Sequence, residues 1–481
     1  MADDTAGQVH PELRAYSDLG RDDAARKAAT LETLGKLIEN GSLTTVLLGL
    51  PDMQGRLVGK RLAARYFLDH VADQGADVCS YLLATDLDMR PLDGYALTSW
   101  QSGFGDMYLQ PDLTTWWPAA GTRSIDGEPS RDVREVIVLA DARYAHAGPG
   151  PLAVEVAPRQ MLRRQLQYLS RTWGLTAKAG LECEFTVFRG EDAVRTLLPL
   201  GRHNGDYALH HPLHQGQFLR ELEDTLTGAG LPLEAVKTEA DPGQVEVTFR
   251  YGPAMAAADN HTVFKHLARQ TAQWTENTAT FMAAPTTGTS NGLHLHLSLW
   301  AGEQSVLDDG RDGLSETGQH ALAGLLDVLP QLMPLMLPYA NSYRRIIPGT
   351  FAPTRMCWGR DNRAAAVRVV GHGDSLHLEI RIPGADANPY LALAAALAAC
   401  RSGLERKLHL PEPVTGNDYG DAPHLPRGLA AATAAFDGSE LAAQILTPEV
   451  VAHYTRAARH EADVLARTVT DAERDRGFTR A

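Results

Sequence analysis

The sequence is poor in cysteine and has no long apolar segment. Its four cysteines, at positions 79, 183, 357 and 400, are scattered without paired spacing. We therefore expect neither a disulfide framework nor a cysteine metal site. The longest apolar helical run, residues 391–400, is too short to cross a bilayer. The first residues lack the basic and apolar regions of a signal peptide, so a reducing cytoplasmic location is expected.

Basic residues are outnumbered by acidic ones. The chain has 59 acidic and 45 basic residues, which gives a formal net charge of −14. This balance argues against a nucleic-acid-binding surface, because such a surface normally carries a basic patch. A Walker-type glycine loop is also missing from the sequence, which excludes a P-loop nucleotide site. Anionic substrates would need arginines gathered locally, and the second half of the chain supplies Arg344, Arg345, Arg360, Arg363, Arg368 and Arg381.

The pattern of apolar residues predicts two domains of unequal size. We expect a loose leader over residues 1–20, a small β-rich domain over 21–148 and a large α+β domain over 155–481. The stretch between the domains, residues 145–153, is rich in glycine and proline, which is typical of a boundary. The segment 410–440 is loop-like. Long helices are expected at 158–174, 254–281, 315–338 and 388–407.

Four short segments alternate apolar residues with potential metal ligands. Strict alternation predicts a β-strand, because the side chains of a strand point to opposite faces with a period of two. The segments are LECEF at 181–185, PGQVEVTF at 242–249, LHLHLSL at 293–299 and LHLEIRIP at 376–383. Their polar faces present Glu182 and Glu184, Gln244 and Glu246, His294, His296 and Ser298, and His377, Glu379 and Arg381.

Each segment has an ordinary structural explanation when it is taken alone. Two glutamates at alternate positions usually form a solvated sheet face, and two histidines at that spacing often occur by chance. Glu379 and Arg381 could form a structural ion pair. The combination is different, because solvent-facing strand positions tolerate many residue types. Repeated use of glutamate and histidine in four segments therefore favours a shared function.

The ligand set favours hard divalent cations. Oxygen-rich sets suit Mg²⁺ or Mn²⁺, while zinc and iron–sulfur sites favour more nitrogen or sulfur. Carboxylates crowded together would repel one another unless cations lay between them. With several arginines nearby, the set indicates a phosphoryl-transfer site, in which metals bridge polyphosphate oxygens. The six candidate ligands are Glu182, Glu184, Glu239, Glu246, His294 and Glu379.

These residues lie in motifs that resemble the glutamine synthetase family. The N-terminal half contributes DGYALTSW at 93–100 and GDMYLQPD at 105–112. The metal strands lie within AGLECEF, KTEADPGQVEV and TATFMAAPTTGTSNGLHLHLS. NSYRRIIPG, NRAAAVRV and LEIRIPGADANPYLALAAAL complete the series in the family's order. The resemblance covers the chain from near residue 40 to past residue 400.

The resemblance implies a two-domain α+β fold and a large assembly. An N-terminal β-grasp domain would precede a catalytic domain with a curved antiparallel sheet and outer helices. The subunits would form a dodecamer of two stacked hexameric rings, with each active site between neighbouring subunits of a ring. Asp93 and Trp100 would then reach the site of a neighbouring subunit. The implied partners are ATP, glutamate and about two or three Mg²⁺ or Mn²⁺ ions per site.

The resemblance also implies a role for each matching residue. One metal, on the glutamate side, would be held by Glu184, Glu239 and Glu246. A second metal, on the ATP phosphates, would be held by Glu182, His294 and Glu379. Glutamate would be bound by Arg345, by Arg381 close to the reacting γ-carboxyl, and by the metal ligand Glu184. ATP would be contacted by His296, Ser298, Arg363 and Arg368. His377 matches no role, and we treat it as structural.

The sequence departs from glutamine synthetases at the ammonium site. Their P-G-Y-E-A-P segment reads PGTFAP here, so Phe351 replaces the glutamate that takes a proton from bound ammonium. A phenyl ring can neither accept a proton nor attract a cation by full charge. Asp93 remains as a catalytic residue, while Ala96 replaces a serine hydroxyl. The usual K-P before the metal histidine has Ala284 in place of lysine, and the glutamate-binding loop around Thr289 is altered.

These departures predict a γ-glutamyl-amine ligase. A carbon chain gains about 0.8 kcal/mol per buried methylene, whereas ammonium gains nothing from phenylalanine. PGTFAP and WGRDNR resemble the family branch that joins glutamate to amines such as ethanolamine, polyamines or aromatic amines. We predict an ATP-dependent ligase that works through a γ-glutamyl phosphate, with Phe351 and Ala96 at the amine. An ordinary glutamine synthetase and a catalytically silent family member are the alternatives.

Overall fold

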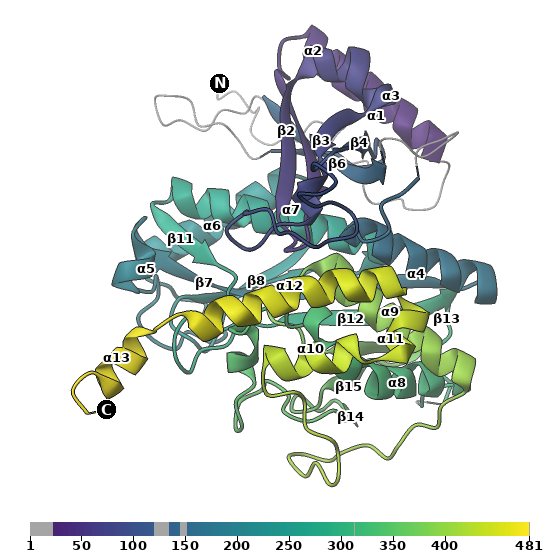
Figure 1. Cartoon of the computed structure of the whole chain (residues 1–481), viewed down its shortest axis with the longest axis vertical. Helices are drawn as coiled ribbons and strands as arrows, with labels where there is room; N and C mark the ends of the chain where they lie inside the picture. The colour runs from purple at the N-terminus through teal and green to yellow at the C-terminus, as the bar shows by residue number, and fades with distance from the viewer. Residues whose placement is uncertain (1–22, 120–133, 145–151, 312, 481) are drawn as a thin grey trace, which may run out of the picture.

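The computed structural model describes residues 23–119, 134–144, 152–311 and 313–480. The leader expected at 1–20 and most of the boundary expected at 145–153 lie outside the described residues. Two sheets organise the described chain, the first formed by strands up to residue 144 and the second by strands from residue 176 (Figure 1). Within the described ranges, every helix is too short or too polar to span a membrane.

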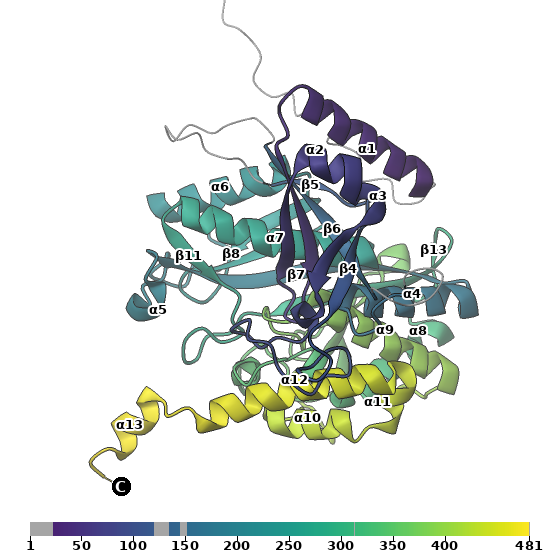
Figure 2. The same cartoon turned by 45° about the horizontal axis from the view of Figure 1, so that its top comes forward.

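The first sheet contains six of the described strands, and helices α1, α2 and α3 lie over it (Figure 2). Its order is β2-β1-β6-β4-β3, with β5 paired to β6. β1 and β6 run parallel, and the other pairs are antiparallel. β6 is a nearly continuous buried run, as expected for a central strand covered on both faces. The elements are α1 (Asp23–Glu39), β1 (Thr45–Pro51), β2 (Leu57–Ala63), α2 (Ala64–Tyr66), α3 (Ala72–Gln74), β3 (Ala76–Cys79), β4 (Asp106–Pro111), β5 (Trp117–Pro118) and β6 (Glu135–Tyr144).

The second sheet contains ten of the described strands, and it carries the predicted ligands. Its order is β14-β15-β16-β12-β7-β9-β8, with β10 and β11 on β7 and β13 on β12. The pairs are antiparallel except for β14 and β15. The strands are β7 (Thr176–Arg189), β8 (Leu233–Thr238), β9 (Gln244–Phe249), β10 (Gly252–Pro253), β11 (Asn277–Thr280), β12 (Leu293–Ala301), β13 (Gln304–Ser305), β14 (Trp358–Arg360), β15 (Val367–Val370) and β16 (His377–Ile380).

Helices of the second half pack around this sheet (Figure 1). α7 lies against the apolar face of β7, where the rings of Phe264 and Phe185 are 5.9 Å apart. α8 and α9 pass so closely that a Cβ on Gly324 would lie 2.2 Å from the Ala399 carbonyl oxygen. The helices are α4 (Pro158–Trp173), α5 (Ala193–Thr196), α6 (Leu213–Gly228), α7 (Ala254–Trp274), α8 (Glu316–Val328), α9 (Pro389–Arg406), α10 (Leu429–Asp437), α11 (Glu440–Ile445), α12 (Pro448–Arg467) and α13 (Asp471–Gly477).

Three expected elements differ from the structure. The helix expected at 254–281 ends at Trp274, because the chain then turns into β11 through a residue with positive φ. The helix expected at 315–338 ends at Val328, because the prolines that follow remove backbone donors and leave only short 3₁₀ turns. The segment expected as a loop, 410–440, includes helix α10.

A buried ion network joins the first sheet to the helices of the second half. Arg159 of α4 is 1% exposed and donates hydrogen bonds to three aspartates. Asp259 lies in α7, Asp141 in β6 and Asp112 directly after β4, each within 2.9 Å of the guanidinium. Tyr390 of α9 donates to Asp259 at 2.7 Å. Since these groups come from five segments, the network fixes the two halves against each other.

Candidate metal and phosphoryl-transfer site

The strand register gathers five of the six predicted ligands on one face of the second sheet, and the sixth, Glu239, directly follows β8. β16, β12, β7 and β9 are successive neighbours. His294 stands opposite Glu182, and Glu184 stands opposite Glu246. Glu379 stands opposite His296. Cross-strand partners share a face, so ligands that are far apart in sequence become adjacent.

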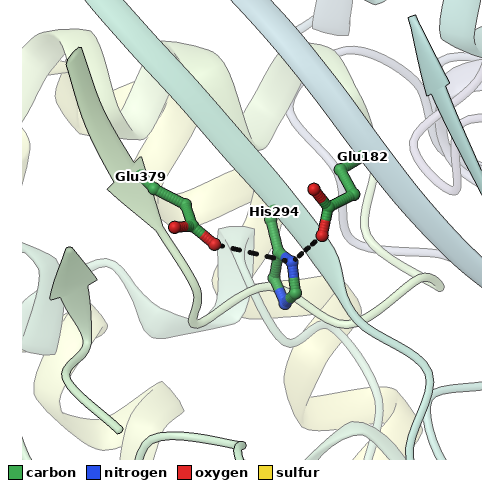
Figure 3. A group of neighbouring side chains, drawn as sticks. All are labelled: Glu182, His294 and Glu379. Carbon is green, nitrogen blue, oxygen red and sulfur yellow. Dashed lines mark hydrogen bonds and ion pairs between the residues drawn. The ribbon is translucent and has the colours of Figure 1, made fainter. Parts of the chain in front are cut away.

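The first cluster consists of Glu182, His294 and Glu379 (Figure 3). Each residue offers one ligand atom, and these atoms lie within 4.8 Å of one another. His294 Nδ1 is 2.7 Å from a Glu182 oxygen and 3.8 Å from a Glu379 oxygen. Burial alone would raise the pKa of Glu379, but the charges of His294 and Arg381 outweigh it and lower the pKa to about 2. Glu379 is therefore held as a carboxylate.

The second cluster consists of Glu184, Glu239 and Glu246, with ligand atoms again within 4.8 Å of one another. Burial, with the negative charge of Glu182, raises the pKa of Glu246 to about 10. The negative charge of the cluster is therefore not fully balanced by nearby positive groups. Lys237 of β8 provides part of the balancing positive charge, since its ammonium contacts Glu239 and lies 3.4 Å from a Glu246 oxygen.

Both clusters fit divalent cations by the chemistry of their donors and by the space between them. Five carboxylates and one imidazole form an oxygen-rich set. Gly292 lies between the clusters, where a Cβ would be 2.7 Å from Arg345 Nη2, 3.0 Å from His294 Nε2 and 3.4 Å from a Glu184 oxygen. A side chain at this position would fill the space that a cation or substrate needs.

Two buried arginines border the clusters. Arg345 is 2% exposed and donates to the carbonyl oxygens of Arg381 and Ile382. Its Nε has no hydrogen-bond partner among the described residues, and burial lowers its pKa to about 10. Arg381 contacts Glu379 and donates to the Arg363 carbonyl. A buried guanidinium nitrogen without a partner is suited to an anionic ligand, because the desolvated donor gains a full hydrogen bond.

A cavity of about 370 Å³ opens beside the first cluster. Its lining includes Glu182, His296, Ser298, Tyr251 and His377. His296 Nδ1 and His377 Nε2 are 3.0 Å apart. His377, treated as structural in the sequence analysis, thus lines the cavity and holds a predicted nucleotide residue. The family motifs assign His377 no role in the site. Its alternation with Glu379 along the strand nevertheless puts its side chain on the ligand face.

Arg368 also belongs to this region. It donates to Glu379 at 2.9 Å and to Asp361, whose backbone has a positive φ of 48°. Arg363 is exposed, and among its described interactions only its carbonyl reaches the site, through Arg381.

The residues predicted at the amine have no hydrogen bond or ion pair to the clusters among the described interactions. Asp93 and Ala96 are exposed, and an Asp93 oxygen accepts the Trp100 amide at 3.2 Å. Phe351 is 72% exposed. None of the interactions found among the described residues joins these three side chains to a metal ligand.

Lys237 and Tyr207 were missed by the sequence analysis. The K-T-E spacing places Lys237 on the same side as Glu239, and this alternation could have found it. Tyr207 comes from a loop more than 20 residues upstream of Glu239, and no pattern links the two. Its ring lies 4.6 Å from Lys237 Nζ.

Comparisons with known proteins agree on one family. The glutamine synthetase catalytic domain matches residues 155–477. Gamma-glutamylethanolamide synthetase GlnA4 of Streptomyces coelicolor is 43% identical over 459 residues, covering 94% of this chain and 96% of that protein. Glutamate–isopropylamine ligase of a Pseudomonas species is 32% identical, covering 87% and 91%. A solved GmaS/ADP complex superposes with a TM-score of 0.79 at 26% identity, covering 92% of this chain and 99% of that one.

Proposed function

This chain belongs to the glutamine synthetase family, and we propose that it is an ATP-dependent ligase that joins the γ-carboxylate of glutamate to a small organic amine. The observation that carries the proposal is the combination of two three-residue ligand clusters with the segment PGTFAP, in which Phe351 matches the glutamate that takes a proton from ammonium in glutamine synthetases. The relatives that act on ethanolamine and isopropylamine support an organic acceptor.

The reaction has two balanced steps. The γ-phosphoryl group of ATP passes to an oxygen of the glutamate γ-carboxylate, and ADP leaves. The nitrogen of the amine then attacks the acyl carbon, the carbon–oxygen bond to phosphate breaks, and a proton leaves the nitrogen. Activation is required because a carboxylate is a poor electrophile.

Each ligand cluster has its own role in this proposal. Glu182, His294 and Glu379 would hold a cation at the ATP phosphates, and the second cluster would hold one at glutamate. Mg²⁺ or Mn²⁺ at these places would neutralise the charge that develops during transfer. Arg345, whose Nε has no partner among the described residues, would bind a glutamate carboxylate, and Arg381 would stabilise the γ-carboxyl during transfer.

The nucleotide would lie on the side of the first cluster. His296 and Ser298 line the adjoining cavity, which supports their assignment to ATP. Arg368, held between Asp361 and Glu379, would contact the phosphates, and Arg363 would join it as the nucleotide binds.

The amine side would be completed by a neighbouring subunit. Asp93, exposed here, would take the proton that leaves the amine, and Trp100 would reach the same site. We further propose a ring dodecamer, a β-grasp fold for the first sheet and its helices, a division at residues 148–155, and a cytoplasmic location. The 71% exposure of Trp100 supports a subunit contact. So does the end of α12 with α13, which extends away from the body (Figures 1 and 2).

An acceptor panel tests the activity. The protein would be incubated with glutamate, ATP and Mg²⁺, together with ammonium, ethanolamine, isopropylamine or benzylamine. Release of ADP and the mass of the product would be measured. An organic γ-glutamylamide as the best product is the expected result. Ammonium as the best acceptor would make the protein an ordinary glutamine synthetase, and no turnover with any acceptor would indicate a silent member.

A further inference from the structure

Lys237 introduces a fixed positive charge at the rim of the second cluster. Its side chain is 24% exposed and comes from β8, directly opposite Glu246 of β9. The ammonium contacts Glu239 and lies 3.4 Å from Glu246. With three carboxylates in the cluster, one bound divalent cation together with Lys237 would leave no net negative charge. A second cation brought by a substrate would therefore find no unpaired acid among the ligands.

Tyr207 fixes the outer side of this lysine. The Tyr207 amide donates to the Thr238 carbonyl at 3.2 Å, and Thr238 Oγ1 donates to the Gly205 carbonyl at 2.6 Å. These bonds fasten the loop to β8 beside Lys237. Tyr207 has a φ of 55°, a left-handed conformation uncommon for a side-chain-bearing residue. Its ring lies 4.6 Å from the ammonium yet stays 69% exposed.

This rim lies away from the nucleotide. The cavity assigned to ATP is lined by Glu182 of the first cluster and by Glu234 of β8; Lys237 is not among its lining residues and contacts Glu239 and Glu246 of the second cluster. The incoming amine must approach the acyl carbon from the side that the nucleotide leaves open. Because the proposed function puts glutamate at the second cluster, this side would bring the amine past the Tyr207 ring and Lys237. Two other acids lie near Tyr207 or Lys237 in the sequence. Asp206 is exposed to water, and Asp241 already accepts a hydrogen bond from the Ser290 amide at 3.0 Å.

We propose that Lys237 restricts the acceptor to primary monoamines with an uncharged substituent and excludes diamines and polyamines; this inference rests on the proposed function. The substituent of a monoamine can lie on the Tyr207 ring. The second ammonium of a diamine would be repelled by Lys237 and by a divalent cation held in the second cluster. Like charges a few ångströms apart disfavour binding strongly where water is partly excluded.

Isosteric acceptors test this role. 3-Aminopropan-1-ol and 1,3-diaminopropane have the same length and differ in a hydroxyl against an ammonium. The wild type should prefer the amino alcohol by about tenfold or more in kcat/KM. Lys237→Gln should reduce this preference by about tenfold, and Lys237→Arg should keep it. Lys178→Gln is the matched control, because Lys178 lies on β7 on the nucleotide side, stacked on Trp300, and its loss should leave the preference unchanged.

A salt series gives the same information without a variant. Raising ionic strength from 0.1 M to 1 M shortens the Debye length from about 10 Å to about 3 Å, so the preference of the wild type should narrow. A wild type that prefers the diamine, or a Lys237→Gln variant that keeps the full preference, would overturn the inference. If Lys237→Gln is inactive with every acceptor, the salt series decides, and an unchanged preference overturns it. Absence of amide from any organic amine would instead refute the proposed function.

Discussion

At the scale of single residues, the site depends on groups whose charge would be unfavourable without a ligand. Glu246 has its pKa raised to about 10 by burial and by the charge of Glu182, although a carboxylate is needed to hold a cation. Arg345 is buried with an Nε that has no partner among the described residues. Such groups persist in folded proteins where a ligand compensates them. Groups of this kind distinguish a binding site from a structural ion network, in which every charge already has a partner.

Glu184→Ala should abolish turnover while leaving the fold intact, because this side chain contributes coordination rather than packing. Activity should fall by about 100-fold or more. The rise in melting temperature on adding Mg²⁺ should shrink, since a ligand that binds the folded state stabilises it. Glu191→Ala, which changes an exposed acid just after the same strand, is the control and should behave as wild type. Unchanged activity in Glu184→Ala would remove the residue from the site.

Phe351→Glu should raise the ratio of ammonium to organic-amine turnover. The new carboxylate would attract ammonium, and its need for solvation would disfavour an alkyl chain. The double variant with Ala96→Ser restores both polar groups and should shift the ratio further. The ratio is measured with equimolar ammonium and ethanolamine by mass spectrometry. A ratio that stays at its wild-type value in both variants would place Phe351 away from the amine.

At the scale of elements, the Arg159 network holds α4 to both halves of the chain. Arg159→Met would leave Asp112, Asp141 and Asp259 without their shared guanidinium. Removing one partner of a buried ion network costs about 3–5 kcal/mol of unfolding free energy. Arg164 lies on the same helix and forms an exposed ion pair with Glu155, which precedes the helix. Arg164→Met should therefore lower the free energy of unfolding by only about 0–1 kcal/mol. Urea unfolding of both variants measures the difference, and equal costs would contradict the role of the network.

The same network predicts a dependence of stability on pH. Burial would raise the pKa of Asp112, but the charge of Arg159 outweighs it and lowers the pKa to about 2. A carboxyl whose pKa is depressed by folding stabilises the protein above its unfolded pKa, near 4. That contribution, about 2 kcal/mol, should be lost as the pH falls from about 5 to about 2. Asp112→Asn should show a shallower loss over this range in urea titrations, and an identical slope would exclude the contribution.

At the scale of the whole molecule, the proposed assembly places each site between two chains. Glu184→Ala and Asp93→Ala should each be inactive as pure oligomers. Mixing the two variants by co-refolding should restore activity, because about a quarter of the randomly formed interfaces would combine an intact Glu184 with an intact Asp93. Light scattering should show a large ring oligomer. A fully active monomer, or mixtures without recovered activity, would refute the shared site.

The features that could be predicted from the sequence are those that depend on neighbouring residues within one strand. Alternation has a period of two, so the sequence alone determined the ligand strands and the donor atoms on their polar faces. Those donors, as oxygen-rich carboxylates with one imidazole, also favour a hard divalent cation over zinc or an iron–sulfur cluster. Helix ends were less predictable, because the prolines after Val328 and the turn after Trp274 act through single backbone positions.

Only the tertiary structure decided how the donors divide and what surrounds them. Which glutamates form one cluster depends on how β16, β12, β7 and β9 pair, and these strands lie far apart in the sequence. Lys237 and Tyr207 meet because a loop is bonded to β8, and His377 reaches His296 across a strand pair. No pattern within any one segment records these neighbours, because the free energy that brings them together comes from packing between segments.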